Sequence, residues 1–312
     1  MSTQRNQVLS VKEARNFLIN YQGLNTACRY TQEKGVISYF EKVGCIQYDP
    51  LNVVGRNADL TLQSRVKGYH ADMLYKLLYQ KRTVIDAWDK MMALYLQKDW
   101  PYFKRLRASK GKEIEAVLAR RNSLQALEHL DEVREHIKKH GPSQSSSIDI
   151  GVCNPGKWGS KKLASAAMDY LFNIGELGIY SKNNVQRTYE FTEKLLKKEI
   201  LEESDPFQSD DEFYEWYVKR RIGSVGMLWA CNGGGWLGHF ISDSDIRNSK
   251  IKRLLEKGEI EEFYVESVKN PFYIRSEDTE YLNKKSTKKE VKFLAPLDNL
   301  LWDRKMIRDI FD

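Results

Sequence analysis

The chain has 312 residues, 30% of them charged and 41% hydrophobic, with a formal net charge of +7. This length is too great for one small core, so two or three modules are expected. The five histidines are dispersed without metal-ligand spacing, and no uncharged apolar run could cross a bilayer. We therefore expect a cytoplasmic protein without a metal site, whose basic charge permits a polyanionic partner without proving one.

The cysteines indicate a reducing compartment rather than a redox or zinc site. They are scattered singly along the chain and form no C-x-x-C pair, at Cys28, Cys45, Cys153 and Cys231. Such a distribution is typical of reduced thiols in the core of a cytosolic protein.

The first hundred residues combine helical patterns with short strands. Ser10 and Glu13 have the spacing of a capping box, and apolar residues then recur on one face of a helix. Further helical patterns cover residues 35–43 and 70–79, and residues 83–88 have the composition of a short strand. We interpret this combination as a winged-helix module.

Within this module, the segment 44–65 carries polar groups in apolar surroundings. Gln47 and Asp49 are two residues apart, so in an extended segment they share one face. Pro50 then ends strand pairing. Two interpretations are open from the residues alone. The amide and carboxylate form a site in a cleft, or Asp49 only stabilises the turn before Pro50 and Gln47 is an ordinary amide at a strand edge.

The middle of the chain predicts a second module of the same kind. Charges of alternating sign between residues 110 and 140 indicate a solvated helical surface. A helix over residues 161–172, stopped by Gly175, precedes two β-prone runs around Asn183 and Asn184. A helix followed by a hairpin is the ending of a winged helix.

That ending recurs about eighty residues later. Residues 254–260, like residues 171–177, combine a helix end, a Gly-Glu pair and a β-prone residue, and another pair of β-prone runs follows them. Weak repetition of this kind argues for tandem copies of one module. The sequence thus predicts winged helices at residues 1–107, 108–204 and 205–283, with a C-terminal segment at residues 284–312.

The run Gly233–Gly238 formally matches the dinucleotide-binding pattern G-x-G-x-x-G. What precedes it is a helical pattern over residues 215–231 rather than a strand. Because the pattern binds a dinucleotide only between a strand and a helix, we interpret it as a tight or flexible loop.

Several motifs together resemble those of the winged-helix crosslink-repair DNA glycosylases of the YcaQ/AlkZ type. They are Ile46-Gln-Tyr-Asp49, Asn52-Val-Val-Gly-Arg56, Leu62-Gln-Ser-Arg65 and Pro296-Leu-Asp-Asn-Leu-Leu-Trp-Asp-Arg304. The resemblance covers most of the chain from about residue 10. It implies a mainly α fold with small β-hairpins (α+β), in which three tandem winged helices surround a DNA-binding concavity. Because relatives continue beyond Arg304 into a β-rich segment, it also implies that this segment is truncated here.

The resemblance further implies an activity. A monofunctional glycosylase of this type hydrolyses the N-glycosidic bond of N7-alkylpurines, including those of interstrand crosslinks, in base-excision repair. It needs no cofactor, and we expect a monomer acting on double-stranded DNA at the nucleoid. Carried onto this chain, the family's Gln-x-Asp catalytic pair is Gln47 and Asp49.

Polar and basic residues near the motifs are the expected DNA contacts. They are Arg56, Asn57 and Arg65 in the first module, and Lys161, Lys162, Lys182 and Arg187 in the second. Alternatively, Arg56 and Arg65 pair with Asp49 or Asp59, and the basic residues of the second module form a solvated face. Asp298 and Arg304 are expected to pair and to close the C-terminal segment on the first module.

The chain also departs from the family pattern. Many relatives carry Trp-x-His where this chain has Trp88-Asp89-Lys90, which puts the range of lesions in doubt. The competing function is a winged-helix protein or transcriptional regulator that binds DNA without catalysis. A carboxylate in a DNA-binding cleft argues against it, because the carboxylate would repel phosphate.

Overall fold

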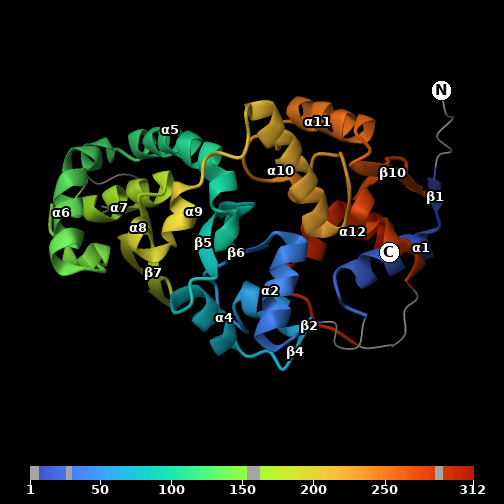
Figure 1. The fold of residues 1–312 in the computed structure, drawn as a ribbon, viewed down its shortest axis with the longest axis horizontal. Coiled ribbons are helices and arrows are strands. Elements are labelled where there is room, and N and C mark those ends of the chain that lie inside the picture. Colours follow the sequence, from blue (N-terminus) through green and yellow to red (C-terminus); the bar gives the residue numbers. More distant parts are fainter. Residues whose placement is uncertain (1–6, 26–29, 153–161, 285–290) are drawn as a thin grey trace. The chain divides into compact units, whose positions relative to one another are not determined.

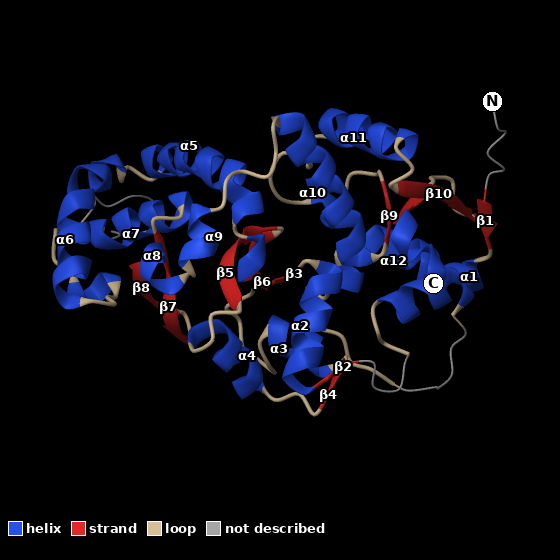
Figure 2. Cartoon of the chain, viewed as in Figure 1, coloured by secondary structure: helices blue, strands red, loops and turns tan. Residues whose placement is uncertain are grey.

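The computed structural model describes residues 7–25, 30–152, 162–284 and 291–312 and is rich in helices with small sheets, as predicted (Figures 1 and 2). By its internal contacts the chain divides into two compact units. Unit 1 comprises Met1–Tyr75, Asp89–Leu96 and Phe207–Asp312, and unit 2 comprises Lys76–Trp88 and Gln97–Pro206. Among the described residues, no helix is long and apolar enough to cross a membrane.

Unit 1 contains the helices α1 (Val11–Tyr21), α2 (Gln32–Val43), α3 (Asn57–Gln63), α10 (Asp210–Val225), α11 (Ser244–Glu256) and α12 (Arg304–Phe311). Its strands are β1 (Gln7–Leu9), β2 (Tyr30–Thr31), β3 (Cys45–Gln47), β4 (Val66–Lys67), β6 (Met91–Leu96), β9 (Met227–Trp229), β10 (Ile260–Val265) and β11 (Phe272–Arg275). Unit 2 contains α5 (Lys104–Arg120), α6 (Leu130–His140), α7 (Leu163–Ile174), β7 (Leu177–Asn183), β8 (Gln186–Phe191), α8 (Thr192–Leu195) and α9 (Lys198–Glu202). The elements α4 (Ala71–Tyr79) and β5 (Val84–Asp89) belong partly to each unit.

In unit 1, α1 begins with the predicted capping box, in which Ser10 and Glu13 bond each other's backbone N–H groups. The buried face of α1 packs against the end of α10. The Tyr21 hydroxyl donates to the Gly223 carbonyl at 2.7 Å, and a Cβ on Gly226 would lie 2.3 Å from the Tyr21 ring. Gly226 is therefore required by close packing as well as by its φ of 103°.

The segment that follows α10 corrects one expectation. The helical pattern was expected to continue to residue 231, but α10 ends at Val225 and β9 follows. The positive φ of Gly226 ends the helix, and β9 then pairs antiparallel with β11 in a sheet of order β1-β10-β11-β9. The run Gly233–Gly238 is a tight loop, one of the two forms expected, with a 3₁₀ turn at Gly234–Trp236. A Cβ on Gly234 would lie 2.1 Å from the Trp302 carbonyl oxygen, so the loop also packs closely on the C-terminal segment.

In unit 2, the predicted hairpin is confirmed as β7 and β8. Asn183 pairs with Gln186, and Asn184 turns the chain with a φ of 53°. The helix before it ends at Gly175, whose left-handed conformation was the predicted stop. The charged segment between residues 110 and 140 is interrupted, since Asn122 adopts a φ of 53° between α5 and α6.

The remaining sequence predictions have mixed outcomes. The expected strand at residues 83–88 is β5, and the later β-prone pair is the hairpin of β10 and β11. Cys45 is a buried thiol, whereas Cys231 is partly exposed. Cys28 and Cys153 lie outside the described residues. The division into three winged-helix modules stays a prediction. The first and third predicted modules fall largely in unit 1, and the second falls in unit 2.

Candidate active site

The strand β3 changes from buried to accessible along its length. It pairs antiparallel with β6, and both Cys45 and Ile46 are fully buried. Pairing extends one residue further, because the Tyr48 N–H donates to the Met92 carbonyl at 2.9 Å. Gln47 and Asp49 are partly exposed. The end of β3 thus presents an amide and a carboxylate from a rigid base.

Lys90, in the turn between β5 and β6, fixes the side chain of Gln47. Its Nζ donates to Gln47 Oε1 at 2.8 Å, and its side chain lies over the Trp302 ring. A charged ammonium group has N–H donors and no acceptor, so the amide oxygen of Gln47 faces Lys90 and the Nε2 donors remain for other groups. The side chain of Lys90 is buried.

The pKa of Lys90 falls to about 7 in these surroundings. Burial is the largest cause, because it disfavours the charged amine, and the nearby Arg221 lowers the pKa further. The acidic groups of Cys45 and Asp89 oppose this shift without cancelling it. Lys90 therefore changes its charge near neutral pH, in contact with Gln47.

Beside Lys90, two arginines of α10 hold a buried carboxylate. Arg220 Nε lies 2.9 Å from Asp89 Oδ2, and Arg221 lies 3.5 Å from Oδ1. Burial would raise the pKa of Asp89, but the two arginines outweigh it and lower that pKa. Arg220 also donates to the Gly44 carbonyl at 2.9 Å. This network fixes the start of β3 and the turn that carries Lys90.

Asp49 is held by the loop that follows it. Its Oδ1 accepts the Leu51 N–H at 2.8 Å, which closes a short turn around Pro50. Asp49 therefore stabilises the turn at Pro50, as one of the two interpretations predicted. It occupies one carboxylate oxygen and leaves Oδ2 for a second role.

Asn57 is buried and holds this loop in place by hydrogen bonds. Its predicted role as an exposed DNA contact is therefore wrong. Asn57 is 5% exposed. Its Nδ2 donates to the Gln47 carbonyl at 2.8 Å, and its Oδ1 accepts the Leu297 N–H at 3.0 Å. Because both ends of the amide are used inside the protein, Asn57 joins β3 to the C-terminal segment.

Arg65 requires a larger correction. Its side chain and that of Asp298 are fully buried, and the two form a bidentate pair at 2.7 and 2.8 Å. A guanidinium without exposed area cannot contact phosphate, so the expected DNA contact of Arg65 is wrong. Asp298 thus pairs with Arg65 and not, as expected, with Arg304. This pair still connects the C-terminal segment to the first predicted module. Arg56 lies near Asp59 and is partly exposed.

The C-terminal segment supports β3 from a second position that the sequence did not reveal. Asn299 Nδ2 donates to the Cys45 carbonyl at 2.9 Å, and Trp302 Nε1 donates to the Leu297 carbonyl at 3.1 Å. Asn299 is completely buried. Together with Asn57, it joins the late motif to the strand that carries the Gln-x-Asp motif.

The four DNA contacts expected in the second predicted module differ in their surroundings. Lys161 lies outside the described residues. Lys162 is exposed at the start of α7. Lys182 is buried and paired with Asp86, which corrects its expected role in DNA binding. Arg187 is partly exposed and lies 3.8 Å from Asp169. Lys162 and Arg187 stay candidates for phosphate contacts.

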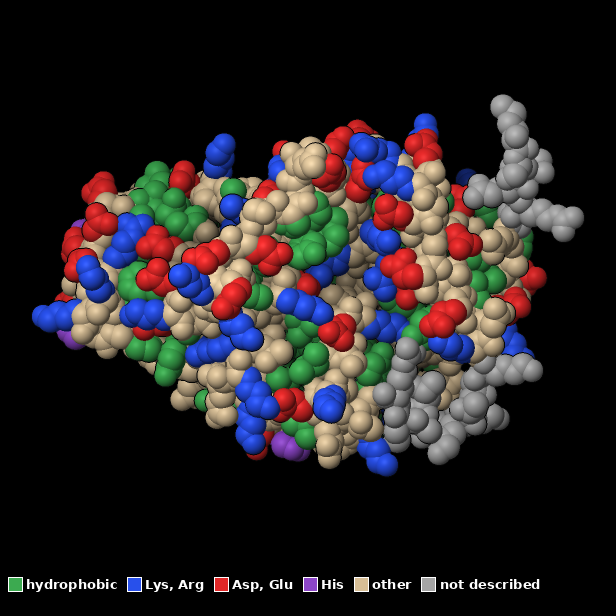
Figure 3. Space-filling model, in the orientation of Figure 1, with side chains coloured by type: hydrophobic (Ala, Val, Ile, Leu, Met, Phe, Trp, Pro, Cys, Tyr) green, Lys and Arg blue, Asp and Glu red, His purple; other side chains and the backbone are tan. Residues whose placement is uncertain are grey.

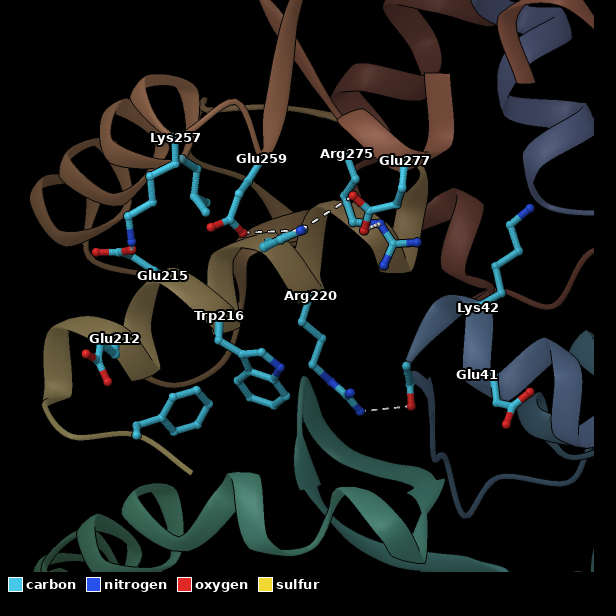
Figure 4. Close-up of a pocket in the computed structure, with 14 residues that line it drawn as sticks. Glu41, Lys42, Glu212, Glu215, Trp216, Arg220, Lys257, Glu259, Arg275 and Glu277 are labelled. Carbon is cyan, nitrogen blue, oxygen red and sulfur yellow. Dashed lines mark hydrogen bonds and ion pairs between the residues drawn. The ribbon is translucent and has the colours of Figure 1, made fainter. Parts of the chain in front are cut away.

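A pocket of about 440 Å³ lies in unit 1 beside Gly44 (Figure 4). Neither Gln47 nor Asp49 lines it. Two of its lysines are paired with lining carboxylates, Lys257 with Glu215 and Lys219 with Glu259. Since these two lysines already have carboxylate partners, they contribute little to binding an anion.

The charged surface does not single out a binding face in the view shown. Lys and Arg side chains alternate there with Asp and Glu side chains (Figure 3). On this face, the distribution of charge therefore does not locate a contact with DNA.

Comparison with known proteins decides the family. Residues 40–312 match the family described as "DNA glycosylase AlkZ-like". The chain belongs to this family. The match includes β3, its Gln-x-Asp motif and the C-terminal segment that supports it, and it makes the AlkZ-like chain a DNA glycosylase acting on DNA.

A solved structure agrees with the AlkZ-like fold. The chain is similar to the Streptomyces sahachiroi DNA glycosylase AlkZ, with a TM-score of 0.61 and 14% sequence identity. The match covers 94% of this chain and 77% of that one. At this identity the likeness shows the shared fold alone.

Proposed function

We propose that this AlkZ-like chain is a monofunctional glycosylase that hydrolyses the N-glycosidic bond of N7-alkylpurines and unhooks interstrand crosslinks. Gln47 and Asp49 are the proposed catalytic pair. The observation that carries the proposal is the partly exposed amide and carboxylate at the end of a buried strand. Both side chains have fixed orientations, one through Lys90 and the other through Leu51.

The chemistry needs few groups. Alkylation at N7 gives the purine a positive charge and makes it a good leaving group. The enzyme then has to stabilise an oxocarbenium-like sugar and to direct a water at it. Asp49 can do both, by its negative charge and by accepting a proton from water at Oδ2. The Nε2 donors of Gln47 are suited to orienting that carboxylate.

The proposal includes crosslinks because of the position of the pair. A base tethered to the opposite strand cannot rotate into a deep pocket, as in the usual flipping mechanism. Gln47 and Asp49 stand at the accessible end of β3, and they do not line the pocket beside Gly44. An open site of this kind suits a base that stays close to its duplex.

Lys90 makes the reaction sensitive to pH. We expect the rate of base release to rise between about pH 6 and pH 8, with an apparent pKa near 7. Below that pKa the charged amine beside Gln47 opposes the positive charge that develops on the sugar. Above it the neutral amine still donates to Gln47 Oε1 without that opposition. Single-turnover rates across this range measure the effect.

The matched variants for this prediction are Lys90→Met and Lys67→Met. Lys90→Met removes the titrating amine, so its rate should not change with pH near 7. Lys67 is exposed on β4, and Lys67→Met should keep the wild-type profile. A rise near pH 7 that persists in Lys90→Met would assign the titration to another group.

The finer specificity is tested with a duplex carrying one nitrogen-mustard crosslink. Denaturing electrophoresis should show separated strands after incubation with the protein, without strand cleavage before alkali treatment. Cleavage before alkali would show lyase activity and contradict the monofunctional assignment. If no lesion is released while DNA binds with a steep salt dependence, the non-catalytic binding protein is the better explanation.

A further inference from the structure

The loop between β3 and α3 has an apolar tip. Leu51, Val53 and Val54 are 68%, 88% and 85% exposed. Single exposed apolar side chains are normal on protein surfaces. Three within four consecutive residues form a concentrated apolar patch, which usually marks a contact with another molecule.

Both ends of this loop are fixed. At its start, the Leu51 N–H is bonded to Asp49 Oδ1. At its end, Leu60 packs so closely on Gly55 that a Cβ there would lie 2.8 Å from Leu60 Cδ2. Asn57 then ties the chain back to the Gln47 carbonyl. The tip thus projects from a base that is continuous with the Gln-x-Asp motif.

We propose that Leu51, Val53 and Val54 form a wedge that enters duplex DNA beside the lesion and opens the stack next to the alkylated purine. This inference rests on the proposed function and deepens it. The occupant is a base step of DNA, because Leu51 is bonded to the carboxylate of Asp49. A protein seated on this tip would lie against Asp49, where the substrate of a DNA glycosylase has to bind.

The properties of the tip fit this task. Aliphatic side chains without charge can enter between bases, and such wedges partly unstack and kink a duplex. A crosslinked purine that cannot rotate outwards still has to be exposed at its sugar, and opening the neighbouring step achieves this exposure. Because the wedge and Asp49 share one turn, insertion would also set the position of the carboxylate relative to the sugar.

The test uses a duplex with one N7-methylguanine and 2-aminopurine beside it, whose fluorescence rises when it unstacks. The wild type is expected to raise the emission on binding. The double variant Val53→Ser with Val54→Ser should lose this rise and should release base about 10-fold to 100-fold more slowly from duplex DNA. Release from single-stranded DNA should be unchanged, because no stack has to be opened.

Val8→Ser is the control, since Val8 is an exposed apolar residue of β1, and it should behave as the wild type does. Equal emission and equal base release by wild type and double variant would overturn the wedge while leaving the glycosylase assignment intact. If the wild type releases no base, the proposed function fails. A rise in emission that depends on Val53 and Val54 would then still support the wedge.

Discussion

Replacing Asp49 with asparagine is expected to slow the release of an N7-alkylated purine by about 10²-fold to 10⁴-fold, the range for loss of a general base. The substitution keeps the size of the side chain and an oxygen that can accept the Leu51 N–H. The loop should therefore keep its conformation. What is lost is the negative charge that stabilises the sugar cation and the group that accepts the proton from water.

DNA binding separates this effect from a loss of affinity. Asp49→Asn removes a charge that repels phosphate, so the variant should bind DNA at least as tightly as the wild type does. Asp72→Asn, on the exposed surface of α4, makes the same change in net charge and should leave single-turnover release unaltered. A similar loss of rate in both variants would attribute the effect to charge in general and not to Asp49.

Gln47 should behave as part of the same unit. Gln47→Ala removes the hydrogen-bond partner of Lys90 and, in the proposed mechanism, the amide that orients Asp49. Its effect on the rate should be smaller than that of Asp49→Asn, and the double variant should lose little more than Asp49→Asn alone, since groups that act as a unit are not additive. Fully additive losses would show that the two residues act independently.

The second large effect concerns stability. Asp298→Ala is expected to lower the free energy of unfolding by about 3–5 kcal/mol, because it leaves the guanidinium of Arg65 buried without its carboxylate. Asp298 Oδ1 also accepts the Leu300 N–H at 3.0 Å, so a backbone donor loses its partner too. Urea denaturation followed by circular dichroism measures the loss.

Two comparisons define the origin of that loss. Asp131→Ala removes the carboxylate of an exposed pair with Arg134 and should change stability little. Combining Arg65→Met with Asp298→Leu removes both charges from the interior and should recover much of the loss seen in Asp298→Ala. If the double replacement is as unstable as Asp298→Ala, the buried charge is not the cause.

Features encoded by neighbouring residues could be predicted from the sequence. The capping box at Ser10, the stop at Gly175 and the hairpin around Asn184 depend on contacts within a few residues. The exception is the end of α10. There, a glycine that packs against Tyr21 interrupts a helical pattern, and the distant residue is not visible in the local pattern.

The candidate site shows where sequence reasoning reaches its limit. Gln47 and Asp49 were selected by their spacing and by resemblance, and the structure shows both partly exposed at the end of β3. The partner of Arg65 lies 233 residues away in sequence, so burial of that arginine follows only from the fold. In the sequence, Lys90 stands out only as a departure from a family motif. Its contact with Gln47 depends on how β3 lies against the turn before β6.

The most direct test of the central claim is a product analysis of duplex DNA carrying one N7-methylguanine. Mass spectrometry should detect the free base after incubation with the wild type, together with an unbroken strand that contains an abasic site. With Asp49→Asn at the same occupancy of DNA, free base should form about 10²-fold to 10⁴-fold more slowly than with the wild type. Tight DNA binding by the wild type without any release of free base, or equal release by both proteins, would contradict the assignment.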